Sequence, residues 1–423
     1  MNKNLIYRAL AKYVWPDRSC MVGGAFFFLV LFSLFVMRPF RSAVAAQIGT
    51  SDLTYFLIIV VLVMLLANGI YSLIVSRIPE RKLVLCIYSF FILNLFLYAL
   101  GNYIFPDSYW IGVSFYVWYN VFNFFVVSIF WARTINCFNP EDATKYFGVI
   151  SACGSAGAWV GSQSVLFFLS DLPVVAMLLA SLALAGGIFI SSQLKHEAPS
   201  ENNKESTNII SELTEQFAQI RANPLIRKLL IYAFIWTCLA TALYFFSIEI
   251  ISAYTNDAIK QREIFALADS IVTPLSFFIQ LLLARVILRT QWLGIRFVIV
   301  AYGFLFCLCF LAISGHLSNL LLTSSGIVIF LVISAVMRPF EYALNKPARE
   351  SIYTSLGRRE KYKSTVFIDT FVNRFGDASG GLLFNAIILM GISIAIAPLA
   401  IIPVAGCLSF VGHKIAPKRQ TAV

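Results

Sequence analysis

Long stretches without charged residues alternate with short polar segments along this chain. The first runs from Ser19 to Met37, about the length that an α-helix needs to cross a bilayer. Five more follow before residue 195: Leu53–Ser76, Leu83–Pro106, Ser108–Ala132, Tyr146–Ser170 and Leu172–Leu194. The first part of the chain is therefore predicted to form six membrane-spanning helices.

The second part repeats this pattern with more polar residues. Its predicted spans are Leu229–Ile248, Ile264–Ala284, the long run Phe297–Met337, a charged helix from about Tyr362 and a run that ends at Val411. The long run has to be split, and Ser314-Gly-His-Leu-Ser-Asn319 supplies turn residues for it. Gly391 predicts a similar break before the last span, which gives twelve spans in all.

Composition and charge agree with a polytopic membrane protein. Hydrophobic residues make up 59% and charged residues 13%, against about 25% charged in soluble domains. The Lys and Arg residues that give the net charge of +11 lie mostly in loops of one parity, and the opposite loops hold only Lys260 and Arg262. We therefore expect a bacterial inner membrane protein with both termini in the cytoplasm. Because the basic residues follow loop parity, nucleic-acid binding is not expected.

A polar stretch divides the chain into two halves. We expect a six-helix bundle over residues 1–194, a cytoplasmic linker over 195–224 with an amphipathic helix near Ile209 to Ile220, and a second six-helix bundle over 225–423. Ala132-Arg133 and Lys145-Tyr146 return, with the same spacing, as Ala348-Arg349 and Lys361-Tyr362. This all-α arrangement resembles the major facilitator architecture, in which helices one, four, seven and ten line a central cavity.

Arginines at membrane depth are the strongest functional signal. The string Met-Arg-Pro-Phe occurs at Met37–Phe40 and again at Met337–Phe340, and Arg41 follows the first copy. A guanidinium at the bilayer centre costs about 2.5–3.5 kcal/mol on insertion scales, so these groups are expected to face a wet cavity and to meet an anion or a carboxylate. Pro39, Pro339 and Pro347 are expected to expose backbone carbonyls beside these charges or simply to kink the helices.

Further polar residues fall at helical spacing in the second half. Arg338, Glu341, Asn345 and Arg349 form one predicted stripe on helix ten. Helix eleven carries Asp369, Asn373 and Asp377 with Arg374 beside them, helix seven Glu249 and helix eight Asp269. Two interpretations stay open: Asp269, Arg374 and Asp377 pair with one another across the bundles, or the polar residues serve transport. For Arg38, Arg41, Arg338 and Arg349 we favour contact with substrate, since bidentate arginine suits phosphate and carboxylate groups.

Small residues gather on two helices. Gly154, Gly157 and Gly161 lie on helix five, and Gly376, Gly380 and Gly381 lie on helix eleven. Such faces let another helix approach closely, so we interpret them as packing surfaces, with ligand contact as the alternative.

Several kinds of chemistry have no support in the sequence. There is no phosphate-binding loop, no HExxH motif and no pair of nucleophile and base, so we expect neither an enzyme nor a metal or cofactor site.

Several motifs resemble the ATP:ADP antiporter (nucleotide translocase) family, and the most specific lie between Arg338 and Gly381. The matching segments are Phe130-Trp131, Lys145 to Gly157, Pro347 to Glu350, Glu360 to Lys363, Phe367 to Asp369 and Arg374 to Gly381. The resemblance implies a facilitator-type fold that exchanges anionic nucleotides without hydrolysis. The exchangers use a Lys in helix one, a Glu in helix four, a Glu in helix seven and a Lys in helix ten. Here Val44 or a near neighbour and Asn136 stand at the first two positions, Glu249 at the third and Arg349 at the fourth.

These observations lead to a functional hypothesis. The chain is expected to move a small anionic solute, a nucleotide or another phosphorylated metabolite, by alternating access. Arg38, Arg41, Arg338 and Arg349 would hold the anion, with Asn136, Glu341 and Asn345 beside them. Glu249, Arg133, Asp369, Arg374 and Asp377 would serve charge balance, coupling or pairing between the bundles. The alternatives are a proton-coupled symporter or exporter, in which Glu249 carries the proton, and a membrane scaffold that transports nothing.

Overall fold

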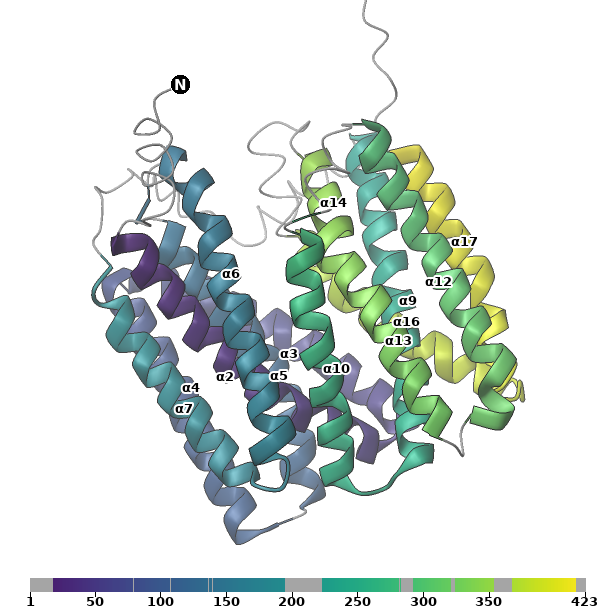
Figure 1. The fold of residues 1–423 in the computed structure, drawn as a ribbon, viewed down its shortest axis with the longest axis horizontal. Helices are drawn as coiled ribbons and strands as arrows, with labels where there is room; N and C mark the ends of the chain where they lie inside the picture. Colours follow the sequence, from purple (N-terminus) through teal and green to yellow (C-terminus); the bar gives the residue numbers. More distant parts are fainter. Residues whose placement is uncertain are drawn as a thin grey trace, which may run out of the picture. The chain divides into compact units, whose positions relative to one another are not determined.

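The structure is a computed structural model that describes residues 18–78, 80–106, 108–135, 137–138, 140–194, 223–280, 282, 292–320, 324–353 and 367–415. Within these ranges the regular elements are all helices (Figure 1). Before residue 195 they are α2 (Arg18–Ile48), α3 (Thr50–Arg77), α4 (Glu80–Ile104), α5 (Tyr109–Ile135), α6 (Pro140–Ser164), the π-helical segment η1 (Val165–Leu169) and α7 (Pro173–Ser191). After residue 222 they are α9 (Pro224–Tyr254), α10 (Ala258–Ile279), α12 (Trp292–Leu320), α13 (Ser324–Phe340), η3 (Glu341–Asn345), α14 (Lys346–Tyr353), η4 (Ile368–Val372), α16 (Asn373–Leu389) and α17 (Ala397–Ile415).

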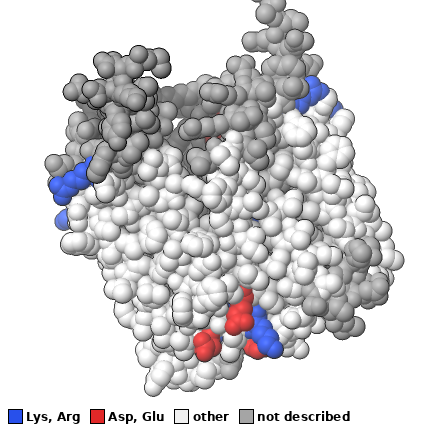
Figure 2. All heavy atoms as spheres, viewed as in Figure 1, with Lys and Arg blue, Asp and Glu red and all other residues white. Residues whose placement is uncertain are grey.

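The helices coincide with the apolar runs of the sequence. In the described ranges, nine helices are long and apolar enough to cross a membrane. The predicted spans at α6, α10 and α16 are not among these nine, so the count of twelve crossings stays a prediction. Most of the described surface that faces the reader in Figure 2 carries no charged side chain. Large apolar side chains such as Phe90, Phe304 and Leu308 are exposed, as expected of surfaces that contact lipid.

Glycines with positive φ mark two of the helix ends. Gly49 (φ 81°) separates α2 from α3, and Gly391 (φ 78°) follows the end of α16. Glycine adopts this left-handed region without steric cost, and the predicted break at Gly391 is confirmed. The predicted turn at Ser314–Asn319 is wrong, because α12 continues to Leu320. In hydrocarbon a helix satisfies every backbone polar group, and this requirement outweighs the weak turn preference of Ser, Gly and Asn.

The chain divides into two compact units. The described residues of 1–40, 72–111 and 121–204 belong to unit 1, and those of 41–71, 112–120 and 205–423 belong to unit 2. Unit 2 therefore includes the end of α2, most of α3 and a short part of α5 together with the second half of the chain. The predicted bundle boundaries at residues 194 and 225 stay a prediction. The amphipathic helix expected near Ile209 lies outside the described residues.

Aromatic side chains fill the core of unit 1. The Phe27 ring stacks on Phe130 with 4.2 Å between the centroids, and Phe26 meets Phe130 edge-on at 5.0 Å. The buried Tyr88 hydroxyl donates a hydrogen bond to the backbone oxygen of Val126 at 2.8 Å, because a buried hydroxyl needs a partner. These contacts hold α2, α4 and α5 together.

The small-residue face of α6 allows close packing against α2 within unit 1. A Cβ atom at Gly157 would overlap the backbone oxygen of Phe28, and one at Gly161 would lie 2.8 Å from the backbone oxygen of Phe32. The glycines therefore bring the two backbones into contact, which confirms that this face is a packing surface.

Within unit 2, α16 packs on α9 in the same way. A Cβ at Gly376 would lie 3.0 Å from the backbone oxygen of Phe234, and one at Gly380 would overlap the backbone oxygen of Cys238. Each unit thus holds a helix pair in which two glycines, four residues apart, meet two carbonyls that are also four residues apart. This repeated arrangement agrees with the short motifs that recur, with the same spacing, in the two halves of the sequence.

Candidate functional site

The predicted tenth helix, which corresponds to α13, η3 and α14, changes its winding where its polar residues lie. Helix α13 ends at Phe340, the π-helical segment η3 covers Glu341–Asn345, and α14 follows. Pro339 and Pro347 flank this segment, and each lacks the backbone N–H that would close a helical hydrogen bond. π-Helical segments are common at functional sites because they shift the register of the side chains that follow.

The shifted register brings together three residues of the predicted stripe. Arg349 donates to Oε1 of Glu341 at 2.6 Å, and the Asn345 amide donates to Oε2 of Glu341 at 2.5 Å. Tyr232 of α9 donates through its hydroxyl to Oδ1 of Asn345 at 2.8 Å, and the Arg349 guanidinium lies 4.8 Å from the centre of the Trp236 ring. We call these five residues the Glu341 cluster.

The Glu341 cluster is buried and its formal charge is balanced. Asn345 is 0% exposed, Glu341 7% and Arg349 9%. The buried carboxylate accepts two hydrogen bonds, one of them from the oppositely charged Arg349, which offsets part of its cost of desolvation. Arg349 can therefore bind a substrate anion only if its contact with Glu341 breaks and the anion takes the place of the carboxylate.

Arg338 makes a different contact. It lies one turn before the π-helical segment and pairs with Asp269 of α10, with 2.5 Å between Nη2 of Arg338 and Oδ1 of Asp269. The Asp269 side chain is only 4% exposed, so it needs this positive partner. The predicted stripe is thus divided: three of its residues form one cluster, and Arg338 joins α13 to α10.

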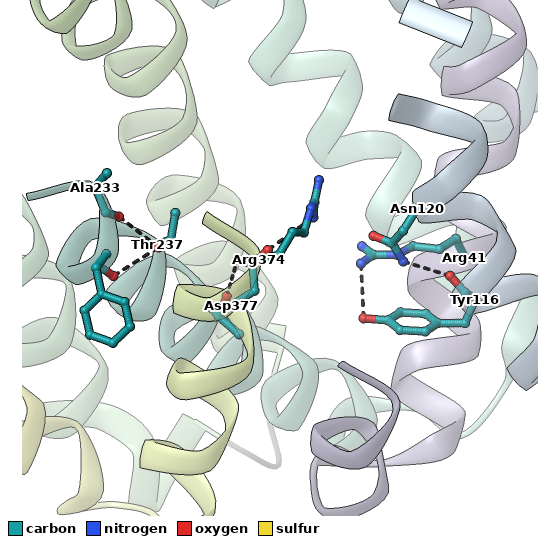
Figure 3. A network of polar contacts seen from close by, with 9 residues as sticks. Arg41, Tyr116, Asn120, Ala233, Thr237, Arg374 and Asp377 are labelled. Carbon is teal, nitrogen blue, oxygen red and sulfur yellow. Dashed lines mark hydrogen bonds and ion pairs between the residues drawn. The ribbon is translucent and has the colours of Figure 1, made fainter. Parts of the chain in front are cut away.

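A second group surrounds Arg41, where α2, α5 and α9 meet in unit 2. Arg41 donates to the Tyr116 hydroxyl at 3.1 Å, and its guanidinium carbon lies 4.6 Å from the centre of the Tyr116 ring and 5.5 Å from that of Tyr244. The Tyr244 hydroxyl is buried and has no hydrogen-bond partner in the part of the chain that the structure describes. Figure 3 shows Arg41 and Tyr116 on one side and Asp377 and Arg374 on the other.

Asp377 of α16 completes this group. Its carboxylate accepts hydrogen bonds from Thr241 at 2.9 Å and from Arg374 at 3.2 Å (Figure 3). Asp377 also interacts electrostatically with Arg41. We call Arg41, Tyr116, Tyr244, Arg374 and Asp377 the Arg41 cluster. It holds two guanidiniums and one carboxylate beside two tyrosine rings.

The remaining predicted residues lie elsewhere. Arg38 belongs to unit 1, with its guanidinium 5.1 Å from the centre of the Phe35 ring. Arg133, also in unit 1, donates to the backbone oxygen of Leu194 at 2.7 Å, after the end of α7. Asn136 lies outside the described residues, as does the side chain of Asp369 within η4.

Glu249 lies near the end of α9, five residues beyond Tyr244 of the Arg41 cluster. Its carboxylate accepts a short hydrogen bond from the Thr50 hydroxyl, at the start of α3. The predicted roles of Glu249 and of the other polar residues in binding or coupling stay predictions.

Sequence reasoning missed the aromatic half of both clusters. Tyr116, Tyr232, Trp236 and Tyr244 contact arginines or their partners, but the chain contains 18 tyrosines and 7 tryptophans, and most lie in apolar runs. A usable signal would have been an aromatic residue on a helix assigned to the cavity. Residue type alone does not separate such a ring from one that faces lipid.

No protein-family model matches this sequence, and no curated protein matches it either. Solved structures do match. The crystal structure of the nucleoside transporter NupG aligns over 94% of this chain and 100% of its own, with 11% identity and a TM-score of 0.66. The POT family transporter PepTSo aligns over 95% and 98%, with 14% identity and a TM-score of 0.65. An auto-inhibited POT family peptide transporter aligns over 96% and 98%, with 12% identity and a TM-score of 0.64.

At these identities the likeness shows the fold. The predicted fold class, an all-α polytopic membrane protein, is confirmed, and the fold is the one that these transporter structures share. The narrower resemblance to the ATP:ADP antiporter family has no support from a family model or a curated relative.

Proposed function

On the premise of this fold, we propose that the protein is a secondary transporter that moves a small anionic solute, a nucleotide or another phosphorylated metabolite, by alternating access. The observation that carries the proposal is the Arg41 cluster. Among the described residues, two guanidiniums and one carboxylate lie there beside two tyrosine rings, on helices that the major facilitator resemblance assigns to the cavity or its border. An arginine at this depth is costly unless it meets a negative group.

The chemistry of the cluster favours a solute with both an anionic and an aromatic part. A planar guanidinium binds phosphate oxygens in a bidentate manner. Tyrosine and tryptophan rings provide flat surfaces on which a base can stack. Tyr116 and Tyr244 lie beside Arg41, and Trp236 lies beside Arg349, so both kinds of group are present. A nucleotide carries both parts, whereas inorganic phosphate carries only one.

We assign the principal anion contact to Arg41. Arg338 and Arg349 already contact carboxylates, so each would reach the solute only by exchanging its partner. Arg38, Asn136, Glu341 and Asn345 remain candidate contacts, and Asp369, Arg374, Asp377 and Arg133 remain candidates for charge balance or coupling. The proposed site is the bacterial inner membrane, with both termini in the cytoplasm.

The test is counterflow of labelled nucleotide into liposomes loaded with unlabelled ATP, ADP or phosphate. Arg41→Ala should raise the half-saturating concentration by at least tenfold, because a hydrogen bond to a charged group contributes about 1.5–3 kcal/mol. Arg41→Lys should recover part of the loss, since it keeps the charge but not the planar fork. Arg227→Ala, at an exposed position of α9, is the matched control and should leave exchange unchanged.

The other outcomes separate the alternatives. Full exchange by Arg41→Ala would refute the assignment of the anion contact. Uptake that needs a proton gradient and no internal solute would indicate a proton-coupled symporter or exporter. A protein with no uptake and no ligand-dependent shift of its melting temperature would be a scaffold.

A further inference from the structure

Three contacts fix the turn between α2 and α3 against α9 and α16, all within unit 2. Thr50, the first residue of α3, donates its hydroxyl hydrogen bond to Glu249 of α9. Asn385 of α16 donates through its amide to Oγ1 of Thr54 at 2.9 Å. Ser252 of α9 donates to the backbone oxygen of Ala46 at 3.0 Å. Two helices from the second half of the chain therefore hold one helical hairpin from the first half.

The packing around these contacts is tight. A Cβ atom at Gly381 of α16 would lie 3.1 Å from Oγ1 of Thr54 and 3.3 Å from Cδ1 of Leu57. Thr54 is buried, at 2% exposure, so its hydroxyl depends on protein partners. The absence of a side chain at Gly381 allows α16 to reach α3 at this point.

The contacts lie on the same helices as the Arg41 cluster. Thr241 and Glu249 are eight residues apart on α9, and Asp377 and Asn385 are eight residues apart on α16. Two helical turns correspond to roughly 12 Å at 1.5 Å per residue. Each of the two helices thus carries a polar residue at the Arg41 cluster, Thr241 on α9 and Asp377 on α16. About two turns later each carries a residue that contacts the hairpin. On the predicted topology, the α2–α3 turn lies on the face opposite the cytoplasmic loops.

We propose that Thr50, Thr54, Glu249 and Asn385 form a latch that closes the path from this face to the Arg41 cluster. Glu249 is then a positioning residue rather than a substrate contact. Alternating access requires the path on this face to open once in each transport cycle, so the latch has to release at that step. The role of the latch in transport rests on the proposed function. That the latch contacts can form and break does not rest on it.

The test follows the latch by disulfide formation between Thr54→Cys and Asn385→Cys in the full-length protein, with the exposed Cys86 and Cys407 changed to Ser. Glu249→Ala should slow this cross-linking about tenfold, which corresponds to ~1.4 kcal/mol in favour of the open state. Glu249→Gln keeps an acceptor for Thr50 and should stay within about twofold of the parent.

Ser247→Ala is the matched control. The Ser247 hydroxyl bonds within its own helix, to the backbone oxygen of Leu243 at 2.9 Å, so its loss should not change the cross-linking rate. If Glu249→Ala does not give folded protein, Thr50→Val removes the other partner with little change in shape and should slow cross-linking equally. A rate in the folded Glu249 or Thr50 variant equal to that of the parent would overturn the latch.

A second measurement connects the latch to transport. If the parent exchanges an anion, oxidation of the Thr54→Cys/Asn385→Cys pair should abolish exchange, and reduction should restore it. Continued exchange after complete cross-linking would refute the role in transport. If the parent moves none of the tested anions, the proposed function fails, but the cross-linking rates still decide whether the latch exists.

Discussion

The Glu341–Arg349 pair predicts a large and specific loss of stability when one partner is removed. Arg349→Ala would leave the Glu341 carboxylate buried without its positive partner, and Glu341 is only 7% exposed. Removing one member of a buried ion pair costs about 3–5 kcal/mol. With a shift of about 2–4 °C per kcal/mol in domains of a few hundred residues, the melting temperature should fall by roughly 6–20 °C.

A double variant separates this effect from substrate binding. In Glu341→Gln/Arg349→Met both charges are absent and the side-chain volumes are nearly kept. Most of the lost stability should therefore return, because replacing both members of a buried pair is often neutral. The coupling between the two sites should be at least about 2 kcal/mol in a double-mutant cycle.

The assay is thermal unfolding in detergent, followed by the reactivity of the buried thiols. The reasoning would be refuted if Arg349→Ala melted at the temperature of the parent. It would also be refuted if the double variant were less stable than Arg349→Ala. The double variant also helps to interpret transport. If Arg349→Ala stops transport and the stable double variant stops it too, Arg349 contacts the substrate. If the double variant still transports, the loss in Arg349→Ala reflects lost stability.

Two further predictions concern packing and topology. Gly157→Ala should lower the free energy of unfolding by about 1–3 kcal/mol, because the added Cβ would overlap the backbone of Phe28. The yield of folded protein in size-exclusion chromatography should fall accordingly. The control Gly406→Ala has open space around it and should behave like the parent. Tags on the two termini should be accessible from the same, cytoplasmic side in intact cells, as the Lys and Arg distribution requires; accessibility on opposite sides would mean an odd number of crossings.

The sequence predicted most of what depends on helical periodicity. The spacing of Glu341, Asn345 and Arg349 placed them on one face, and they do form one cluster. The same spacing also included Arg338, which pairs with Asp269 instead. Periodicity assigns a residue to a face of its own helix, but it does not say which neighbouring helix that face meets.

In the Arg41 cluster, the sequence identified the arginine but not the residues that it contacts. Arg41 was recognised because a charge in an apolar run is rare, and rarity made the signal clear. Its partners Tyr116 and Tyr244 are common residues in common surroundings, and only the packing of α5 and α9 distinguishes them. The contact between Thr50 and Glu249 joins residues 199 positions apart and had no local signal at all.

The two glycine-bearing helix pairs also provide an internal distance standard. Where α6 meets α2 and α16 meets α9, backbone atoms lie so close that neither helix can slide along its partner without overlap. Spectroscopic labels placed on the two helices of one pair should therefore keep a constant separation in every state of the protein. Any change measured between other helices can then be read against that fixed length, which separates true rearrangement from motion of the labels themselves.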